Sequence, residues 1–156
     1  MDLFVRGARK AADEFGKEGI RVVVLGSRER LSAKVAQTID KIEADTKNGE
    51  RGVLAICFNY GGRQEIVDAA AAMMREGVEP EGLTAEVLGR YMYHPEVPSL
   101  DMIIRSSGEQ RLSGYMLWRS EYAELYFTEV LWPDFRPADF DVALDWYAGR
   151  KRRFGA

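Results

Sequence analysis

The chain has 156 residues, of which 46% are hydrophobic, and its formal net charge is −3 at pH 7. This length supports one hydrophobic core, so we expect a single domain over residues 1–156. The charge gives no reason to expect a nucleic acid as a partner, and the one cysteine, Cys57, argues against disulfides and cysteine-based metal clusters. No apolar segment approaches the roughly 20 residues of a membrane span, and no signal-peptide pattern opens the chain, so we expect a cytoplasmic protein.

Helix and strand patterns alternate along the chain, without repeats or a linker long enough to divide domains. The predicted elements are, in chain order, a helix over residues 2–18, a strand over 20–25, a helix from the N-cap Ser32 to about residue 47, a strand over 53–58, a helix over 63–76, a short helix from the N-cap Thr84 to Tyr91, strands over 100–105 and 123–127, and a last helix opened by Pro137. Val35, Ile39 and Ile42 form the inner face of the second helix, and Phe140, Leu144 and Tyr147 lie on one side of the last. Strands separated by helices indicate an α/β fold, with a mainly parallel sheet that has helices on both faces.

The loop after the strand that ends at Arg105 has the composition of a phosphate site. Arg105 and Arg111 can each bind two phosphate oxygens, and Ser113 can donate a hydroxyl group. Two carboxylates, which a diphosphate held with Mg²⁺ would need, lie nearby in the sequence: Glu109 and Glu124. A solvated surface network of arginines and a glutamate explains the loop alone equally well.

A second candidate for an anion site follows the strand predicted over residues 53–58. Asn59, Gly61, Gly62 and Arg63 lie between this strand and a helix, where paired glycines bring backbone N–H groups forward at a helix N-terminus. The alternative is a plain strand-to-helix turn in which Asn59 bonds to the local backbone. The residues alone favour the plain turn.

Other conspicuous residues favour structural roles. The only histidine, His94, stands before a proline in a loop, which is poor evidence for acid–base catalysis or metal binding. A basic run over residues 150–153 is usual at a solvated helix end. Five large aromatic residues are better explained by packing in a core or a subunit interface than by a stacking surface: Trp118, Tyr122, Tyr126, Phe127 and Trp132.

A long motif runs through the C-terminal half of the chain. Residues 104–113 read Ile-Arg-Ser-Ser-Gly-Glu-Gln-Arg-Leu-Ser, followed by Leu-Trp at 117–118, Tyr-Ala-Glu-Leu-Tyr-Phe at 122–127 and Leu-Trp-Pro-Asp-Phe at 131–135. With Asn-Tyr-Gly-Gly-Arg at 59–63 and the end of the chain at 150–155, these segments resemble the cis-prenyltransferases, the family that includes undecaprenyl diphosphate synthase. The resemblance extends from about Met1 to the last residue.

This resemblance implies a protein of cis-prenyl chain elongation, which condenses isopentenyl diphosphate with a prenyl diphosphate and uses Mg²⁺. It also implies a homodimer, and peripheral membrane contact through a lipid product. By their places in the motif, Arg105, Arg111 and Ser113 would hold the head group of isopentenyl diphosphate, and Glu124 matches the acidic position associated with Mg²⁺. Two C-terminal residues would complete a diphosphate site, in this subunit or its neighbour: Arg153 and Gly155. Supporting positions are Asn59, Gly61, Gly62, Arg63, Glu109 and Gln110.

The sequence also departs from the family pattern. The family's N-terminal region carries an Asp-Gly-Asn-Gly-Arg loop whose Asp is the principal catalytic carboxylate, and this sequence does not occur in the 156 residues. We therefore assign no catalytic residue and expect the isolated chain to be inactive. The favoured interpretation is the C-terminal part of a cis-prenyltransferase. The alternatives are a non-catalytic partner subunit that lends its arginine loop to a catalytic chain and, less favoured, a bare phosphate-binding module of unrelated function.

Overall fold

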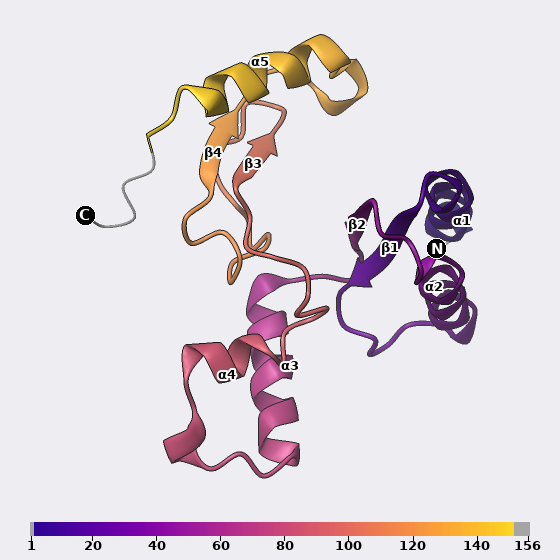
Figure 1. Cartoon of the computed structure of the whole chain (residues 1–156), viewed down its shortest axis with the longest axis vertical. Coiled ribbons are helices and arrows are strands. Elements are labelled where there is room, and N and C mark those ends of the chain that lie inside the picture. Colours follow the sequence, from indigo (N-terminus) through magenta and orange to yellow (C-terminus); the bar gives the residue numbers. More distant parts are fainter. Residues whose placement is uncertain (1, 152–156) are drawn as a thin grey trace. The chain divides into compact units, whose positions relative to one another are not determined.

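The computed structural model describes residues 2–151, and its contacts divide the chain into two compact units. The first unit covers Met1–Val97 and the second covers Pro98–Ala156. Each unit contains one pair of parallel strands, labelled in Figure 1. The single domain expected over residues 1–156 stays a prediction.

Two helices cover the strand pair of the first unit. The strand β1 (Ile20–Leu25) pairs in parallel with β2 (Gly52–Cys57). The helices α1 (Asp2–Lys17) and α2 (Ala33–Thr46) lie next to each other and contact β1 (Figure 1). The last four residues of β1, over 22–25, are all buried, so both faces of this strand are covered.

The hydrophobic core of the first unit joins α1 and α2 to β1. Its buried members fall into two clusters, Val5, Val24, Val35 and Ile39 in one and Ala8, Ala12, Val22 and Ile42 in the other. The inner face predicted for α2 is therefore confirmed. Ser32 occupies the N-cap position of that helix, but its side chain accepts no capping hydrogen bond.

The remaining secondary-structure elements of the first unit are helices. After β2 the chain enters α3 (Gly62–Arg75), passes the 3₁₀ turn η1 (Pro80–Gly82) and forms the short helix α4 (Ala85–Gly89). The predicted cap of α4 is confirmed, because the Thr84 hydroxyl accepts a hydrogen bond from the Val87 N–H at 3.1 Å.

The second unit is built on β3 (Met102–Arg105) and β4 (Glu124–Phe127), which pair in parallel. The 3₁₀ turn η2 (Trp132–Asp134) follows, and α5 (Pro137–Ala148) begins at the predicted proline. Figure 1 shows α5 beside the two strands.

The packing of α5 differs from what its sequence suggests. The small residue Ala143 is fully buried, whereas Phe140 is 44% exposed and Leu144 41% exposed. Much of the apolar side of this helix thus stays on the surface of the unit.

Parallel strands and helices confirm the α/β class, and the strands form two separate pairs. Strand and helix boundaries agree with the prediction to within about two residues, the usual uncertainty of such ends. No helix within residues 2–151 is long and apolar enough to cross a membrane.

Candidate functional site

A cavity of about 400 Å³ lies at the carboxyl end of β3 in the second unit. Its lining residues are Ile103, Ile104, Arg105, Arg111, Leu112, Ser113 and Tyr115. The structure therefore brings together the three residues predicted to bind a diphosphate head group. The carboxyl ends of parallel strands are where α/β proteins usually bind their ligands.

An irregular loop after β3 forms the wall of this cavity. Several of its residues have positive φ angles: Ser107, Gly108, Ser113, Gly114 and Met116. The base of the loop is fixed to the segment after β4, since the Ser107 N–H donates to the Val130 carbonyl at 3.0 Å and the Gly108 N–H donates to the Thr128 carbonyl at 2.8 Å. The loop thus turns sharply while its first residues continue the pairing of the strands.

Two guanidinium groups give the cavity its charge. The Arg105 Nη1 donates to the Ser113 hydroxyl at 3.2 Å, which joins the two ends of the loop. Arg111 lies at the rim with a side chain that is 64% exposed, and it forms an ion pair with Glu109. Because Glu109 already compensates Arg111, an incoming anion has to compete with this carboxylate or rearrange it.

Glu124 lies away from this cavity. In the register of the strand pair it stands opposite Met102, whereas Arg105 stands opposite Phe127 at the other end. The two positions are three steps apart along the strand, which corresponds to about 10 Å. The Glu124 carboxylate accepts a hydrogen bond from the Arg150 Nε at 2.8 Å, and its side chain is only 17% exposed.

The described residues do not assemble a metal centre around Glu124. Within residues 2–151, no group of three or more histidine, cysteine, aspartate or glutamate side chains could hold a metal ion. Glu124 is instead engaged by a cation of the chain itself. The donors present therefore do not fit a self-contained magnesium site.

Gln110, which the sequence analysis also named, does not line the cavity. Gln110 is exposed between Glu109 and Arg111. Arg153 and Gly155 lie outside the described residues, so their predicted part in a diphosphate site stays a prediction.

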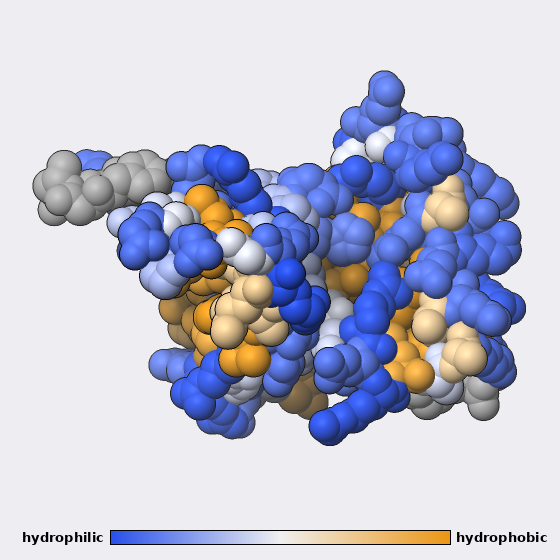
Figure 2. Space-filling model, turned by 90° about the horizontal axis from the view of Figure 1, so that it is seen from below, coloured by the Kyte–Doolittle hydropathy of each residue, from blue (hydrophilic) through white to orange (hydrophobic). Residues whose placement is uncertain are grey.

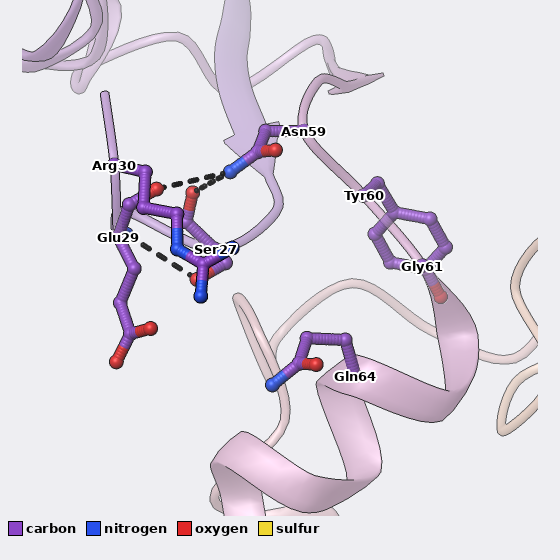
Figure 3. Close-up of a pocket in the computed structure, with 7 residues that line it drawn as sticks. All are labelled: Ser27, Glu29, Arg30, Asn59, Tyr60, Gly61 and Gln64. Atoms are coloured by element: carbon purple, nitrogen blue, oxygen red, sulfur yellow. Dashed lines mark hydrogen bonds between the residues drawn. The ribbon is translucent and has the colours of Figure 1, made fainter. Parts of the chain in front are cut away.

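A second cavity, of about 420 Å³, opens in the first unit where β1 and β2 end and α3 begins. Figure 3 shows its lining residues, which are Ser27, Glu29, Arg30, Asn59, Tyr60, Gly61 and Gln64. The Asn59 amide donates to the carbonyl of Ser27 at 2.8 Å and to that of Glu29 at 3.3 Å. These bonds tie the loop after β2 to the loop after β1, which is a structural role for Asn59.

The other supporting residues predicted in this segment, Gly61, Gly62 and Arg63, do not all line the cavity. Gly61 is the N-cap of α3, Gly62 is its first, buried residue, and Arg63 is exposed and does not line the cavity. Sequence reasoning missed Arg30 and Gln64, whose side chains are seen in Figure 3 on the two sides of the hollow. The end of β1 could have indicated Arg30, because it lies at the same edge as the end of β2.

Buried polar contacts support the wall beneath this second cavity. Glu65 has no exposed surface, and its carboxylate accepts the Tyr60 hydroxyl at 2.5 Å and the Tyr93 N–H at 3.1 Å. The Tyr93 hydroxyl donates to Asp68, and burial together with this hydrogen bond raises the pKa of Tyr93. Helix α3 is thereby fixed to the loop that contains Tyr93.

The only histidine belongs to a charged cluster at the end of β1. The His94 Nε2 lies 3.1 Å from the Glu43 carboxylate, and its Nδ1 lies 3.2 Å from that of Glu96. Glu43 also accepts the Val24 N–H at 2.9 Å and Arg28 at 3.0 Å. The hydrogen bond to Glu43 raises the pKa of His94 above its usual value, although partial burial opposes this. His94 therefore fastens its loop to α2.

Comparison with known proteins relates the whole chain to one family. The prenyltransferase family model for undecaprenyl diphosphate synthase matches residues 1–155. The isoprenyl transferase of Thermotoga maritima is 46% identical over 99% of this chain and 67% of its own length. A trans,polycis-polyprenyl diphosphate synthase of Thermobifida fusca, specific for (2Z,6E)-farnesyl diphosphate, is 45% identical over 94% of this chain and 54% of its own length.

Two solved structures share the fold. A probable undecaprenyl diphosphate synthase from Campylobacter jejuni matches with a TM-score of 0.88 and 30% identity, over 99% of this chain and 72% of that protein. Lavandulyl diphosphate synthase from Lavandula x intermedia, in complex with dimethylallyl diphosphate, matches with a TM-score of 0.86 and 31% identity, over 99% and 71%. This chain thus spans about half to three quarters of the proteins it matches. From its sequence and its fold, it belongs to the isoprenyl transferase family of undecaprenyl diphosphate synthase.

Proposed function

We propose that this chain binds the head group of isopentenyl diphosphate in the cavity of the second unit and takes part in cis-prenyl chain elongation. The observation that carries the proposal is the convergence of Arg105, Arg111 and Ser113 on one cavity wall in a member of this family. Two guanidinium groups offset much of the charge of a diphosphate, and the hydroxyl group adds a directed donor.

The rest of the cavity wall favours a diphosphate with a short hydrocarbon group. Ile103, Ile104, Leu112 and Tyr115 contribute apolar surface next to the two arginines. Such surface gives no gain in affinity for inorganic diphosphate, but it removes the hydrocarbon of isopentenyl diphosphate from water. We therefore expect isopentenyl diphosphate to bind more tightly than inorganic diphosphate.

Calorimetry with the whole chain tests this assignment. Arg111→Ala should weaken the binding of isopentenyl diphosphate by about 1.5–3 kcal/mol, the usual cost of a lost charged hydrogen bond. Arg75→Ala is a matched control, because Arg75 is also an exposed arginine but lies on α3 in the other unit. Equal affinity of Arg111→Ala and the native chain would refute the site.

We assign no catalytic activity to the isolated chain. The resemblance leaves the catalytic Asp loop unmatched, and the cavity offers binding groups rather than a nucleophile or a base. Mg²⁺ is the expected metal, with Glu124 as its ligand, but the described residues do not complete a site for it. We therefore assign no step to the metal.

Association with a further subunit is supported by exposed apolar surface. Of the five aromatic residues assigned to packing, Trp132 is 73% exposed and Tyr122 is 60% exposed, whereas Tyr126 packs against Trp146 within the unit. Figure 2 shows apolar side chains, in orange, interrupting the polar surface in several places. We propose a homodimer in the cytoplasm, and the same surface also suits the alternative role of a non-catalytic partner subunit.

A further inference from the structure

The ring of His94 lies between two carboxylates. Its Nε2 is 3.1 Å from the Glu43 Oε1, and its Nδ1 is 3.2 Å from the Glu96 Oε1. An ionised carboxylate only accepts hydrogen bonds, so both contacts are satisfied only when both ring nitrogens carry a proton. The arrangement in the structure is therefore that of the charged ring. A neutral ring keeps one N–H, and its other nitrogen then turns a lone pair towards a carboxylate.

The neighbours of the two carboxylates decide which contact a neutral ring keeps. Glu43 also accepts the Val24 N–H at 2.9 Å and Arg28 at 3.0 Å, and its side chain is 22% exposed. Glu96 is 42% exposed, and its other ion pair is with Arg21 of β1 at 3.3 Å. Because Glu43 is held more firmly, the remaining ring proton stays on Nε2. The contact between Nδ1 and Glu96 is then lost.

Arg21 offers the Glu96 carboxylate a second position next to the first. The Nη2 of Arg21 already pairs with Glu96, whereas its Nε is buried and has no hydrogen-bond partner within residues 2–151. A buried donor without an acceptor costs free energy. Nε and Nη2 lie on one edge of the planar guanidinium group, and this edge matches the two oxygens of a carboxylate. A small rotation of the Glu96 side chain would therefore satisfy the Arg21 Nε.

We propose that Glu96 is the moving part of a pH-operated switch. When His94 is charged, Glu96 bridges its ring and Arg21; when the ring gives its proton to water, Glu96 turns away and binds the Nε and Nη2 of Arg21 together. The charged groups around the ring are Glu43 from α2 and Glu96 from the segment of the ring itself, with Arg28 and Arg21 behind them.

The pKa of His94 sets the pH at which the switch operates. The hydrogen bond to Glu43 raises this pKa above 6.5, the bond to Glu96 adds to the effect, and partial burial opposes it. The change therefore occurs as the pH rises through a value above 6.5.

The switch lies in the last segment of the first unit, which ends at Val97. The Val97 N–H donates to the His94 carbonyl at 2.9 Å, so His94 and Glu96 belong to one turn. While the ring is charged, the two side chains hold each other as well as α2 and β1. When the ring is neutral, His94 holds α2 and Glu96 holds β1 separately. The inference does not depend on the binding of a diphosphate.

The test follows the Arg21 Nε–H resonance in the ¹⁵N-labelled whole chain while His94 is titrated. Arg21→Lys assigns this resonance, and the ring resonances of His94, the only histidine, give the midpoint. In the native chain the Arg21 Nε–H should move downfield with that midpoint as the pH rises, because it gains a charged hydrogen bond. Its exchange with water should slow by about tenfold relative to the intrinsic rate, since the bond has to open first.

Glu96→Gln separates the movement of the carboxylate from the loss of charge on His94. In this variant His94 still titrates, but the Arg21 Nε–H should no longer respond, because an amide lacks the second carboxylate oxygen. Glu14→Gln is the matched control and should respond like the native chain, because Glu14 is also an exposed carboxylate but pairs with Lys10 on α1.

The ¹⁵N shifts of the His94 ring complete the test, since they show which nitrogen keeps the proton. Above the midpoint this should be Nε2. An Arg21 Nε–H that does not follow the titration of His94, an equal response in Glu96→Gln, or a neutral ring protonated on Nδ1 would each overturn the proposal.

Discussion

Replacing Glu43 with glutamine should weaken the first unit in a way that depends on pH. In the structure the Glu43 carboxylate is shared by three donors, the His94 ring, the Val24 N–H and Arg28. Glutamine keeps an oxygen for the Val24 N–H, but it removes the negative charge that faces His94 and Arg28. The variant therefore isolates the charged part of this cluster.

The directions of the pKa shifts set the pH range of the effect. The hydrogen bond to Glu43 raises the pKa of His94 above its ordinary value of 6.5. The stability that protonated His94 gains from Glu43 is fully present below pH 6.5. It is lost as the pH rises through the higher pKa that His94 has in the folded chain. Burial would raise the pKa of Glu43, but the bonds from His94 and Val24 outweigh it and hold the pKa below 4.5. The stability that the ionised Glu43 carboxylate contributes is present above pH 4.5. It is lost as the pH falls through the lower pKa that Glu43 has in the folded chain.

The distance and the burial of the pair give the expected size of the effect. The His94 Nε2 and the Glu43 Oε1 are 3.1 Å apart, and the two side chains are 24% and 22% exposed. A charged hydrogen bond in such a partly screened position contributes about 1–2 kcal/mol. We expect Glu43→Gln to lower the free energy of unfolding by that amount at about pH 5.5, and by less at about pH 9, where less of His94 is protonated.

Urea unfolding of the native chain and the variant across this pH range measures the difference. Because His94 is the only histidine, its ring resonances also report its pKa without ambiguity, and this pKa should fall in Glu43→Gln. Asp40→Asn is the matched control, since Asp40 also lies on α2 and pairs with Arg28 but not with His94. A loss of stability that is the same at both pH values, or an unchanged His94 pKa, would refute this account of the cluster.

Four further results are expected. Glu109→Gln should tighten the binding of isopentenyl diphosphate severalfold in calorimetry, because it frees Arg111, and weaker binding would contradict this. Gly26→Ala should lower the free energy of unfolding by more than about 2 kcal/mol in urea, since Gly26 has a φ of +147° and an added Cβ would lie 1.9 Å from the Phe58 carbonyl oxygen; a near-neutral effect would argue against this backbone. Trp132→Glu should dissociate the proposed dimer in light scattering, whereas a constant mass near 17.6 kDa for the native chain would exclude a dimer. The purified chain should not extend farnesyl diphosphate with radiolabelled isopentenyl diphosphate, and a longer labelled product would disprove this.

Local patterns in the sequence were sufficient to predict the helices and strands, and to single out the charged and polar residues that line one cavity. The cap of α4 and the start of α5 depend on Thr84 and Pro137 at the helix ends themselves, so both could be predicted from neighbouring residues. Arg105 ends β3, and Arg111 and Ser113 lie in the short loop that follows it, so the three residues remain close in space whatever the rest of the chain does. The family motif then supplied the ligand that this loop would bind.

Contacts between distant residues were decided by the tertiary structure alone. Glu43 and His94 are 51 positions apart, and Glu124 and Arg150 are 26 apart, so no local periodicity could pair them. The sequence suggested a metal for Glu124, but the register of β3 and β4 places it at the opposite end of the pair from Arg105. Composition and spacing determine which elements form, because those depend on nearby residues. Strand register and helix packing determine which charges meet, because these depend on how the whole core is filled.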